Sequence, residues 1–358
     1  MTGSHGKKNK SPIIFFISVF IVIGIMMFVA NYRSILKAEL DPPASGVEKL
    51  HTVANWLAAI SPRKEVYLWD WNRLNNKPIT SSFEANNVAC LSIDRFIWTP
   101  SDEPGTIIVS NLKGDKKYKR FSLPLGWQCE HIFAARGGGF AVLELIKPAL
   151  AQNSNHYDRI RLDMISPDLD IIANVLIINK QDDNLSINEL AVSDDGAYVA
   201  IVGNRKGQSW VAVGDTKEKK LLWQEASDVS AEFINVAFSP DGKTVYTGGL
   251  GRYVCGFQSS TGKLLRKWQM DEYQTPANKR QHVSCIAASP DGRFLAAGTE
   301  PARDVYNWDV KTGDRLGIIT VGGWVLNGLT FSPDSLTLAT ASPIVEQKIK
   351  IWQAPGAH

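Results

Sequence analysis

The chain has 358 residues, of which 44% are hydrophobic and 21% are charged, a composition typical of a folded protein that excludes wholesale disorder. The formal net charge is +3, and Lys7, Lys8 and Lys10 account for all of it, because the rest of the chain holds equal numbers of basic and acidic residues. A nucleic-acid-binding domain normally carries a basic excess, and the composition offers none. We therefore expect no nucleic-acid partner.

The first predicted element is a transmembrane helix over residues 12–32, after a short basic tail at residues 1–11. No charged residue stands between Ile13 and Ala30, and these eighteen residues, as a helix, would rise about 27 Å, close to the thickness of the bilayer's hydrocarbon core. A cleaved signal peptide would have a shorter apolar core and a small residue where Phe28 stands. The pattern therefore predicts a retained membrane anchor.

The basic residues around this helix predict its orientation. Three lysines precede it, and Arg33, Lys37 and Lys49 follow it. With the amino terminus added, the slight bias favours a cytoplasmic N-terminus and places the large domain outside the cytoplasm. Residues 33–46 are predicted to be a linker, because the Asp41-Pro-Pro-Ala-Ser-Gly46 stretch cannot continue a helix.

Residues 47–354 contain an internal repeat that is clearest in the C-terminal half. Each unit runs from an apolar strand through a Ser-Pro-Asp-Gly type of turn to a short strand rich in small residues, and then to a third strand with an aromatic residue. The turn serines Ser193, Ser239, Ser289 and Ser332 are 46, 50 and 43 residues apart, the period of a four-stranded unit with loop insertions. Proline sets φ, aspartate bonds the backbone ahead and glycine accepts a positive φ. The turn aspartates are therefore predicted to be structural: Asp195, Asp241, Asp291 and Asp334.

The third strands carry a family resemblance. The phrase Val305-Tyr-Asn-Trp-Asp-Val-Lys-Thr-Gly313 resembles the third-strand signature of the WD-repeat family, and Val66-Tyr-Leu-Trp-Asp70 repeats it near the other end. The resemblance is strong over residues 187–353, fair at 53–71 and weak at 85–180. It implies an all-β fold, a β-propeller. The third-strand residues expected to be structural are Trp69, Asp70, Trp308, Asp309 and Trp352. The Gly-His pair usual in this family is absent, so most blades are expected to lack the buried Asp–His hydrogen-bond network.

The same template, placed along the chain, predicts seven blades. Its third strands fall near 66–70, 106–110, 159–165, 209–213, 253–257, 305–309 and 349–352. The last unit lacks an outer strand, and a strand from residues 36–52 would complete it, as propellers of this family commonly close. Those residues must also supply the first strand of blade one. A first blade with a missing strand, and a ring of six or eight blades, therefore stay open as alternatives.

No arrangement of residues predicts catalysis. There are six histidines, and neither a Gly-x-Ser-x-Gly elbow nor a P-loop is present. The Arg136-Gly-Gly-Gly139 run and the Asp194-Asp195 pair both fall at repeat turns and are interpreted as turn structure. The cysteines Cys90, Cys129, Cys255 and Cys285 have no zinc spacing, and whether any pairs in a disulfide stays open. We expect no enzyme activity, no metal and no cofactor.

Loop aromatics and arginines are the candidates for partner contacts, because Trp, Tyr and Arg are enriched at binding hot spots. Trp127 and Trp324 precede first strands, in loops that, by the resemblance, open on the face that most often binds partners. A loop tryptophan also often packs between blades. The predicted partner-binding residues are Trp127, Trp324, Tyr273, Arg280, Arg252 and Arg303. The densest basic run, Lys113 to Arg120, is interpreted as protection of an outer strand or as a patch for anionic headgroups.

These observations predict a membrane-anchored, WD-repeat-like propeller that serves as a scaffold for a protein or peptide partner on its loop face. One alternative is an extracytoplasmic propeller enzyme or small-ligand sensor, which would gather several histidines or acids at the central channel. Another is a subunit of a trafficking or envelope complex, which would have constant partners. A propeller fold hosts many functions, so the fold by itself does not decide between them. The oligomeric state stays open.

Overall fold

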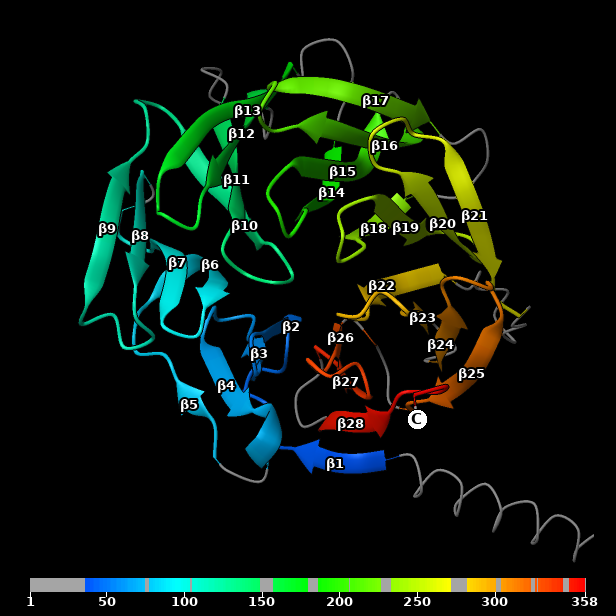
Figure 1. Cartoon of the computed structure of the whole chain (residues 1–358). Helices are drawn as coiled ribbons and strands as arrows, with labels where there is room; N and C mark the ends of the chain where they lie inside the picture. Colours follow the sequence, from blue (N-terminus) through cyan, green and yellow to red (C-terminus); the bar gives the residue numbers. More distant parts are fainter. Residues whose placement is uncertain are drawn as a thin grey trace, which may run out of the picture.

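The protein is described from a computed structural model that covers residues 36–74, 77–103, 105–148, 157–179, 186–205, 207–226, 233–271, 282–300, 304–322, 326, 328–343 and 348–357. Seven four-stranded antiparallel sheets form a ring (Figure 1). This confirms the prediction of an all-β, seven-bladed propeller, and the six-blade and eight-blade alternatives are wrong. Within these ranges, no helix is long and apolar enough to cross a membrane. The predicted span at residues 13–30 lies outside the described residues.

Each of the first six blades consists of four consecutive strands, so the chain fills one blade before it passes to the next. Blades one to three contain β2 (Lys49–Val53), β3 (Trp56–Ile60), β4 (Val66–Asp70), β5 (Ile79–Thr80), β6 (Ala85–Ser92), β7 (Arg95–Pro100), β8 (Thr106–Ser110), β9 (Lys117–Ser122), β10 (Gln128–Ala134), β11 (Ala141–Pro148), β12 (Tyr157–Ile165) and β13 (Ile171–Asn179). A short 3₁₀ turn, η1 (Trp71–Arg73), follows β4.

Blades four to six repeat this order, with the first strand of each blade nearest the axis of the ring (Figure 1). Their strands are β14 (Ser186–Val192), β15 (Tyr198–Arg205), β16 (Gln208–Asp215), β17 (Lys220–Ala226), β18 (Phe233–Phe238), β19 (Thr244–Gly249), β20 (Tyr253–Gln258), β21 (Leu264–Gln269), β22 (His282–Ala288), β23 (Phe294–Glu300), β24 (Asp304–Asp309) and β25 (Arg315–Thr320). The predicted third strands therefore fall on β4, β8, β12, β16, β20 and β24, and the seventh on β28.

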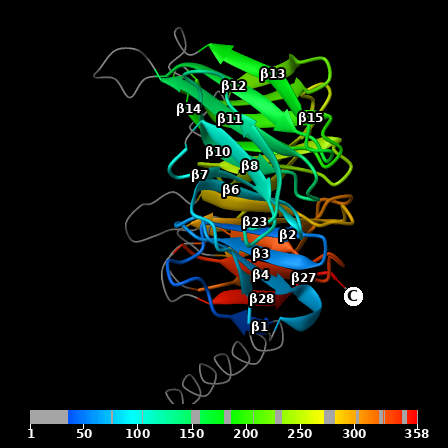
Figure 2. The same ribbon diagram turned by 90° about the vertical axis from the view of Figure 1, so that its left-hand side faces the viewer.

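The seventh blade joins the two ends of the propeller. It contains β26 (Gly328–Phe331), β27 (Thr337–Ala341) and β28 (Ile349–Gln353), and its outer strand is β1 (Leu36–Leu40). β1 pairs antiparallel with β28, with Leu36 opposite Trp352 and Leu40 opposite Ile349. β1 lies alongside β28 in both views (Figures 1 and 2). The N-terminal strand thus closes the ring.

Two predictions about this region are corrected. Residues 33–46 were assigned to a linker, with the propeller starting at residue 47, whereas Leu36–Leu40 is a strand of the ring. The first blade was suspected of missing a strand, but it has all four. This segment has room for both β1 and β2 because each strand is only five residues long. The Asp41–Gly46 stretch turns the chain between them, and the Gly46 amide donates to the Pro43 carbonyl at 2.9 Å. Pro42 and Pro43, which exclude a continued helix, lie in the connection between β1 and β2.

The core consists of apolar layers between neighbouring blades. One cluster joins blades one and two through residues such as Ala58, Ile60 and Trp98, and another joins blades seven and one through Leu40, Leu57 and Ile349. Middle strands such as β8 are buried along their whole length. Because each blade is covered on both faces, these strands are continuously apolar and do not alternate. The ring is therefore held together by packing between blades.

Candidate functional site

The four C-terminal repeat turns share one hydrogen-bond pattern. In each, the serine Oγ donates to the aspartate two residues on and accepts from the backbone amide five residues on; in the Ser239 turn these bonds are 2.6 Å to Asp241 and 2.9 Å from Thr244. The serine-to-aspartate bonds are Ser193–Asp195, Ser239–Asp241, Ser289–Asp291 and Ser332–Asp334, at 2.5–2.6 Å. Each turn is therefore closed by its own side chains, without a histidine.

Two of the turn aspartates, Asp241 and Asp291, are held in the charged form. Burial by itself would raise the pKa of Asp241, but the hydrogen bonds from Ser239 and from the Lys243 amide, together with the Lys243 ammonium, outweigh burial and lower the pKa below 3.8. The pKa of Asp291 is lowered in the same way, by Ser289 and Arg293. These carboxylates are acceptors within turns, which is a structural role.

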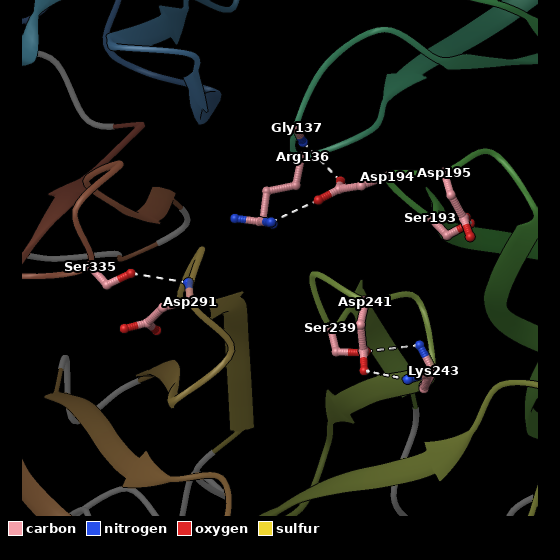
Figure 3. Close-up of polar contacts among 10 residues, drawn as sticks. All are labelled: Arg136, Gly137, Ser193, Asp194, Asp195, Ser239, Asp241, Lys243, Asp291 and Ser335. Carbon is pink, nitrogen blue, oxygen red and sulfur yellow. Dashed lines mark hydrogen bonds and ion pairs between the residues drawn. The ribbon is translucent and has the colours of Figure 1, made fainter.

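The turns gather around the axis of the ring and connect one blade to the next (Figure 3). Arg136 donates from Nη2 to Asp194 Oδ2 at 2.7 Å, and the Gly137 amide donates to Asp194 Oδ1 at 2.8 Å, which joins blades three and four. The Asp291 amide donates to Ser335 Oγ at 3.2 Å and joins blades six and seven. Asp194 is therefore occupied by two donors from the neighbouring blade.

The glycine run at residues 136–139 is a hairpin turn between β10 and β11. The Gly139 amide donates to the Leu91 carbonyl of blade two at 2.7 Å. Gly138 has a φ of +78°, and a Cβ there would lie 2.4 Å from the same carbonyl oxygen. The turn needs glycine because the backbone of the neighbouring blade two comes this close. This contact accounts for the glycine at position 138.

The tryptophans of the third strands are buried between blades. Trp69, Trp308 and Trp352 are at most 3% exposed. The aspartates that follow two of them make turn contacts: Asp70 Oδ1 accepts from the Asn72 amide at 2.9 Å, and Asp309 Oδ1 accepts from the Thr312 amide at 2.8 Å. All five of these side chains belong to the framework of the fold.

Four of the predicted partner-binding residues, Trp324, Tyr273, Arg280 and Arg303, lie outside the described residues. Arg252 is half-buried between β19 and β20, where its carbonyl accepts from the Met270 amide at 2.9 Å. Trp127 is half-buried just before β10 and packs against the cluster between blades two and three. The structure therefore does not bring Trp127 and Arg252 together, since they belong to blades three and five.

Residues 123–127, here called the Leu125 loop, have a fixed base and an exposed tip. Leu125 is 100% exposed. Two residues on, the Trp127 ring lies beneath the Arg161 guanidinium, 5.2 Å from ring centroid to Cζ. Arg161 Nε donates to Asp163 Oδ1 at 2.8 Å, and Nη2 donates to Oδ2. The Asp163 side chain is only 2% exposed, so a buried ion pair holds the arginine over the tryptophan.

Sequence reasoning missed Arg161 and Asp163. They lie in the part of the chain where the repeat is weakest, and both stand on β12, two residues apart. Alternation along a strand places such residues on one face, and this is the signal that would have paired them. The basic run Lys113 to Arg120 leads into β9, the outer strand of blade two, as the sequence predicted. In β9, Arg120 pairs with Glu103, and Lys119 Nζ lies 3.0 Å from Asp170 Oδ1.

A cavity of about 170 Å³, here called the axial cavity, lies among the first strands of the seven blades. Three of the ionisable residues in its lining are Lys49 and His51 on β2 and Glu189 on β14; the others are Arg136, Asp194 and Cys285. The Lys49 ammonium lies 4.4 Å from the centroid of the Phe133 ring. Glu189 Oε2 accepts from the Val236 amide of the next blade at 2.8 Å.

Burial shifts the pKa of all three groups. It raises the pKa of Glu189 to about 7, against the hydrogen bond from Val236 and the charge of Lys49. It lowers the pKa of His51 to about 4, with Lys49 adding to the shift, and lowers the pKa of Lys49 below 10.5. The side chains of Lys49, His51 and Glu189 line the cavity and are half-buried by the surrounding protein. Sequence reasoning missed all three; a polar residue in an otherwise apolar first strand was the available signal.

The cysteines contribute no reactive site. All four are free thiols, and Cys90, Cys255 and Cys285 are buried. Burial raises the pKa of the Cys90 and Cys285 thiols to about 12, so they remain protonated at neutral pH. In the part of the chain that the structure describes, no three histidine, cysteine or acidic side chains lie close enough to hold a metal ion.

The closed ring of seven four-stranded sheets defines a β-propeller, and its Ser-x-Asp turns and third-strand Trp-Asp pairs are similar to those of WD repeats. The family model described as "WD domain, G-beta repeat" matches residues 273–304. The β-propeller domain of Myceliophteria thermophila Cps50 (Swd1) superposes with a TM-score of 0.63, over 89% of this chain and 99% of that one. At 12% identity, this likeness shows the fold alone.

Curated relatives match parts of the chain. Periodic tryptophan protein 2 homolog of Mus musculus is 23% identical over 210 residues, which is 46% of this chain and 22% of that protein. WD repeat domain-containing protein 83 of Danio rerio is 29% identical over 33% of this chain and 35% of that protein. Pre-rRNA-processing protein IPI3 of Mycosarcoma maydis is 24% identical over 48% of this chain and 29% of that protein. The matched part therefore spans about a fifth to a third of the length of these relatives.

Proposed function

We propose that this protein is a non-enzymatic binding platform, tethered to a membrane by residues 13–30, whose propeller holds a protein partner at the Leu125 loop. The supporting observation is that one loop combines a fully exposed leucine with an anchored tryptophan. An apolar side chain on a loop whose conformation is already fixed loses little entropy on binding, and this favours affinity.

Leu125 differs from the other exposed apolar residues. Single exposed apolar side chains are normal on a protein surface and need no explanation. Several of them, such as Ile177 at 55% and Leu265 at 51% exposure, lie on outer strands of blades. Among the residues that the structure describes, Leu125 is the one exposed large apolar residue on a loop between blades, and it lies next to an arginine–tryptophan stack. Tryptophan and arginine are the residue types found most often at binding hot spots.

Photo-crosslinking tests this proposal. A photoreactive residue replaces Leu125 in one variant and Leu265 in the matched control, each in the full-length protein in its native membrane. We expect one protein to be captured from position 125 and not from position 265. Leu125→Ser should then lower the affinity for that protein at least about tenfold, and Leu265→Ser should leave it unchanged. Equal capture from both positions, or an unchanged affinity in Leu125→Ser, would refute the proposed surface.

The membrane tether is a separate part of the proposal, supported by the uncharged run at residues 13–30. We expect the full-length chain to stay with membranes in alkaline carbonate, and a variant lacking residues 1–33 to be released. Release of the full-length chain would contradict the tether.

The orientation can be tested with a cysteine placed at Leu125, because the native thiols are poor reporters. Leu125→Cys on a Cys129→Ser background exposes one thiol fully, since the other three cysteines are buried. A membrane-impermeant maleimide should label it in intact cells if the propeller lies outside the cytoplasm. Labelling only after permeabilisation would reverse the proposed orientation.

The Mycosarcoma maydis relative is named for pre-rRNA processing. We do not extend that role to this chain, because 29% of that protein is matched and the propeller has no basic excess. The small-ligand alternative has one observation in its favour, the ionisable groups of the axial cavity.

A further inference from the structure

The axial cavity is large enough for a small organic molecule. Its volume is about 170 Å³, and most of its lining is alanine, valine, leucine and isoleucine from the first strands. An engineered apolar cavity of about 150 Å³ in a protein core binds benzene. The axial cavity therefore has room for a ligand of roughly six to ten non-hydrogen atoms. This estimate does not depend on any partner at the Leu125 loop.

Lys49 supplies an unmatched positive charge in this cavity. Among the described residues, no hydrogen bond or ion pair involves its ammonium group, whose close neighbour is the face of the Phe133 ring. The charges around it are Glu189, Glu48, Lys64 and Glu144. Glu48 forms an ion pair with Lys64, and Glu144 shares a hydrogen bond with His131. A buried ammonium without an acceptor is costly, because it has lost its hydration shell.

Glu189 and His51 are two further polar groups of the cavity, whose lining also contains Thr52, Asn235 and Thr330 and the paired Arg136 and Asp194. Glu189 is held in position by the Val236 amide, and its raised pKa of about 7 leaves a large share of the carboxyl protonated at neutral pH. Besides Lys49, the Cys285 thiol of β22 also faces it. His51 is neutral at this pH because its pKa is about 4. A protonated carboxyl and a neutral imidazole each have one hydrogen to donate.

These groups select the charge of a ligand. An anion would match the Lys49 ammonium and accept hydrogen bonds from the other two groups, whereas a cation would be repelled by Lys49. A dianion such as phosphate would need a second cation. Arg136, the other cation of the lining, is already paired with Asp194. The apolar lining favours a ligand with an apolar body.

We propose that the axial cavity binds a small apolar monocarboxylate, whose carboxylate pairs with the Lys49 ammonium and accepts hydrogen bonds from His51 and Glu189. Its apolar body lies against the first strands. The site extends the scaffold proposed above with a small-molecule input on the axis of the ring.

Benzoate is the probe for this proposal, used with the full-length protein in detergent and measured by calorimetry. We expect saturable binding below about 10 mM, with one benzoate per chain. Benzylamine, which has the same ring with a positive charge, and inorganic phosphate should bind at least tenfold more weakly. Absence of benzoate binding, or equal binding of the three probes, would overturn the proposal.

Two variants test the roles of individual residues. Lys49→Met keeps the length of the side chain and removes the charge; it should weaken benzoate binding at least about thirtyfold, whereas Lys113→Met, on an exposed turn, should not change it. Because Lys49 has no acceptor, Lys49→Met should fold at least as stably as the native chain, as checked by urea unfolding. Unchanged benzoate affinity in Lys49→Met would refute the site and would leave the Leu125 surface unaffected.

The pH dependence tests Glu189. Benzoate binding favours the protonated carboxyl, so affinity should fall as pH rises from 6 to 8.5. Glu189→Gln keeps a donor and cannot ionise, so its affinity should vary much less over this range. His51 titrates below the range and does not contribute. An equally steep pH dependence in Glu189→Gln would exclude Glu189 from the ligand contacts.

Discussion

Ring closure through β1 predicts that Leu40 stabilises the whole propeller, although it stands just before a Pro-Pro turn near the start of the fold. Leu40 is opposite Ile349 in the antiparallel pair and is 4% exposed. Its side chain packs in the cluster between blades seven and one, with Leu50 and Ile351. Lys37, on the same strand, is exposed and provides the matched control.

The expected cost of Leu40→Ala follows from its burial. Replacing a buried leucine by alanine removes apolar surface and leaves a cavity, which costs 2–5 kcal/mol in general. β1 is an outer strand and can relax inward, so we expect a value near the lower end, about 2–3 kcal/mol. Lys37→Ala changes an exposed side chain and should cost less than about 0.5 kcal/mol.

Urea unfolding of the full-length protein, followed by tryptophan fluorescence, measures both free energies. A double variant with Ile349→Ala adds a sharper test. Since Leu40 and Ile349 are in contact, their effects should differ from additivity by about 0.5–3 kcal/mol. If Leu40→Ala costs no more than Lys37→Ala, or if the two apolar substitutions are additive, β1 does not close the ring.

Three further predictions concern the turns and the Leu125 loop. Gly138→Ala should lower the free energy of unfolding by at least about 3 kcal/mol more than Gly207→Ala does. Both glycines have a positive φ, but of the two only Gly138 would place a Cβ 2.4 Å from a backbone oxygen. Equal costs would show that this close approach is not the reason. Asp163→Ala should cost about 3–5 kcal/mol, because it leaves the Arg161 side chain, which is only 13% exposed, without its carboxylate partner. Glu103→Ala breaks an exposed pair and should cost under about 1 kcal/mol, and similar urea midpoints for the two variants would contradict this. Because the pKa of Asp241 is lowered in the folded state, its carboxylate stabilises the fold at pH values above the unfolded-state pKa of about 3.8. This stabilisation is lost as the pH falls below that value. Asp241→Asn should therefore destabilise the protein by no more than about 1 kcal/mol at pH 5, with a smaller difference at pH 2.5, and a difference that grows on acidification would refute the assignment.

The sequence by itself determined the repeat. The seven third strands, the Ser-x-Asp turns and the buried Trp69 and Trp308 follow from local chemistry: alternation and apolar runs define strands, and proline, aspartate and glycine define the turns between them. Such signals lie within a few residues of one another. This is why the blade count could be predicted even where the repeat is weak.

Only the tertiary structure decided how distant segments meet. The sequence offered residues 36–52 as the source of a closing strand, but it assigned residues 33–46 to a linker because of the prolines after Leu40. The partner strand β28 lies at the other end of the chain. The Arg161–Asp163 pair beneath the Leu125 loop depends on how β12 packs against the loop. Lys49 and Glu189 share one cavity because blades one and four both place their first strands on the axis. No local pattern contains these contacts, because the closing of the ring creates them.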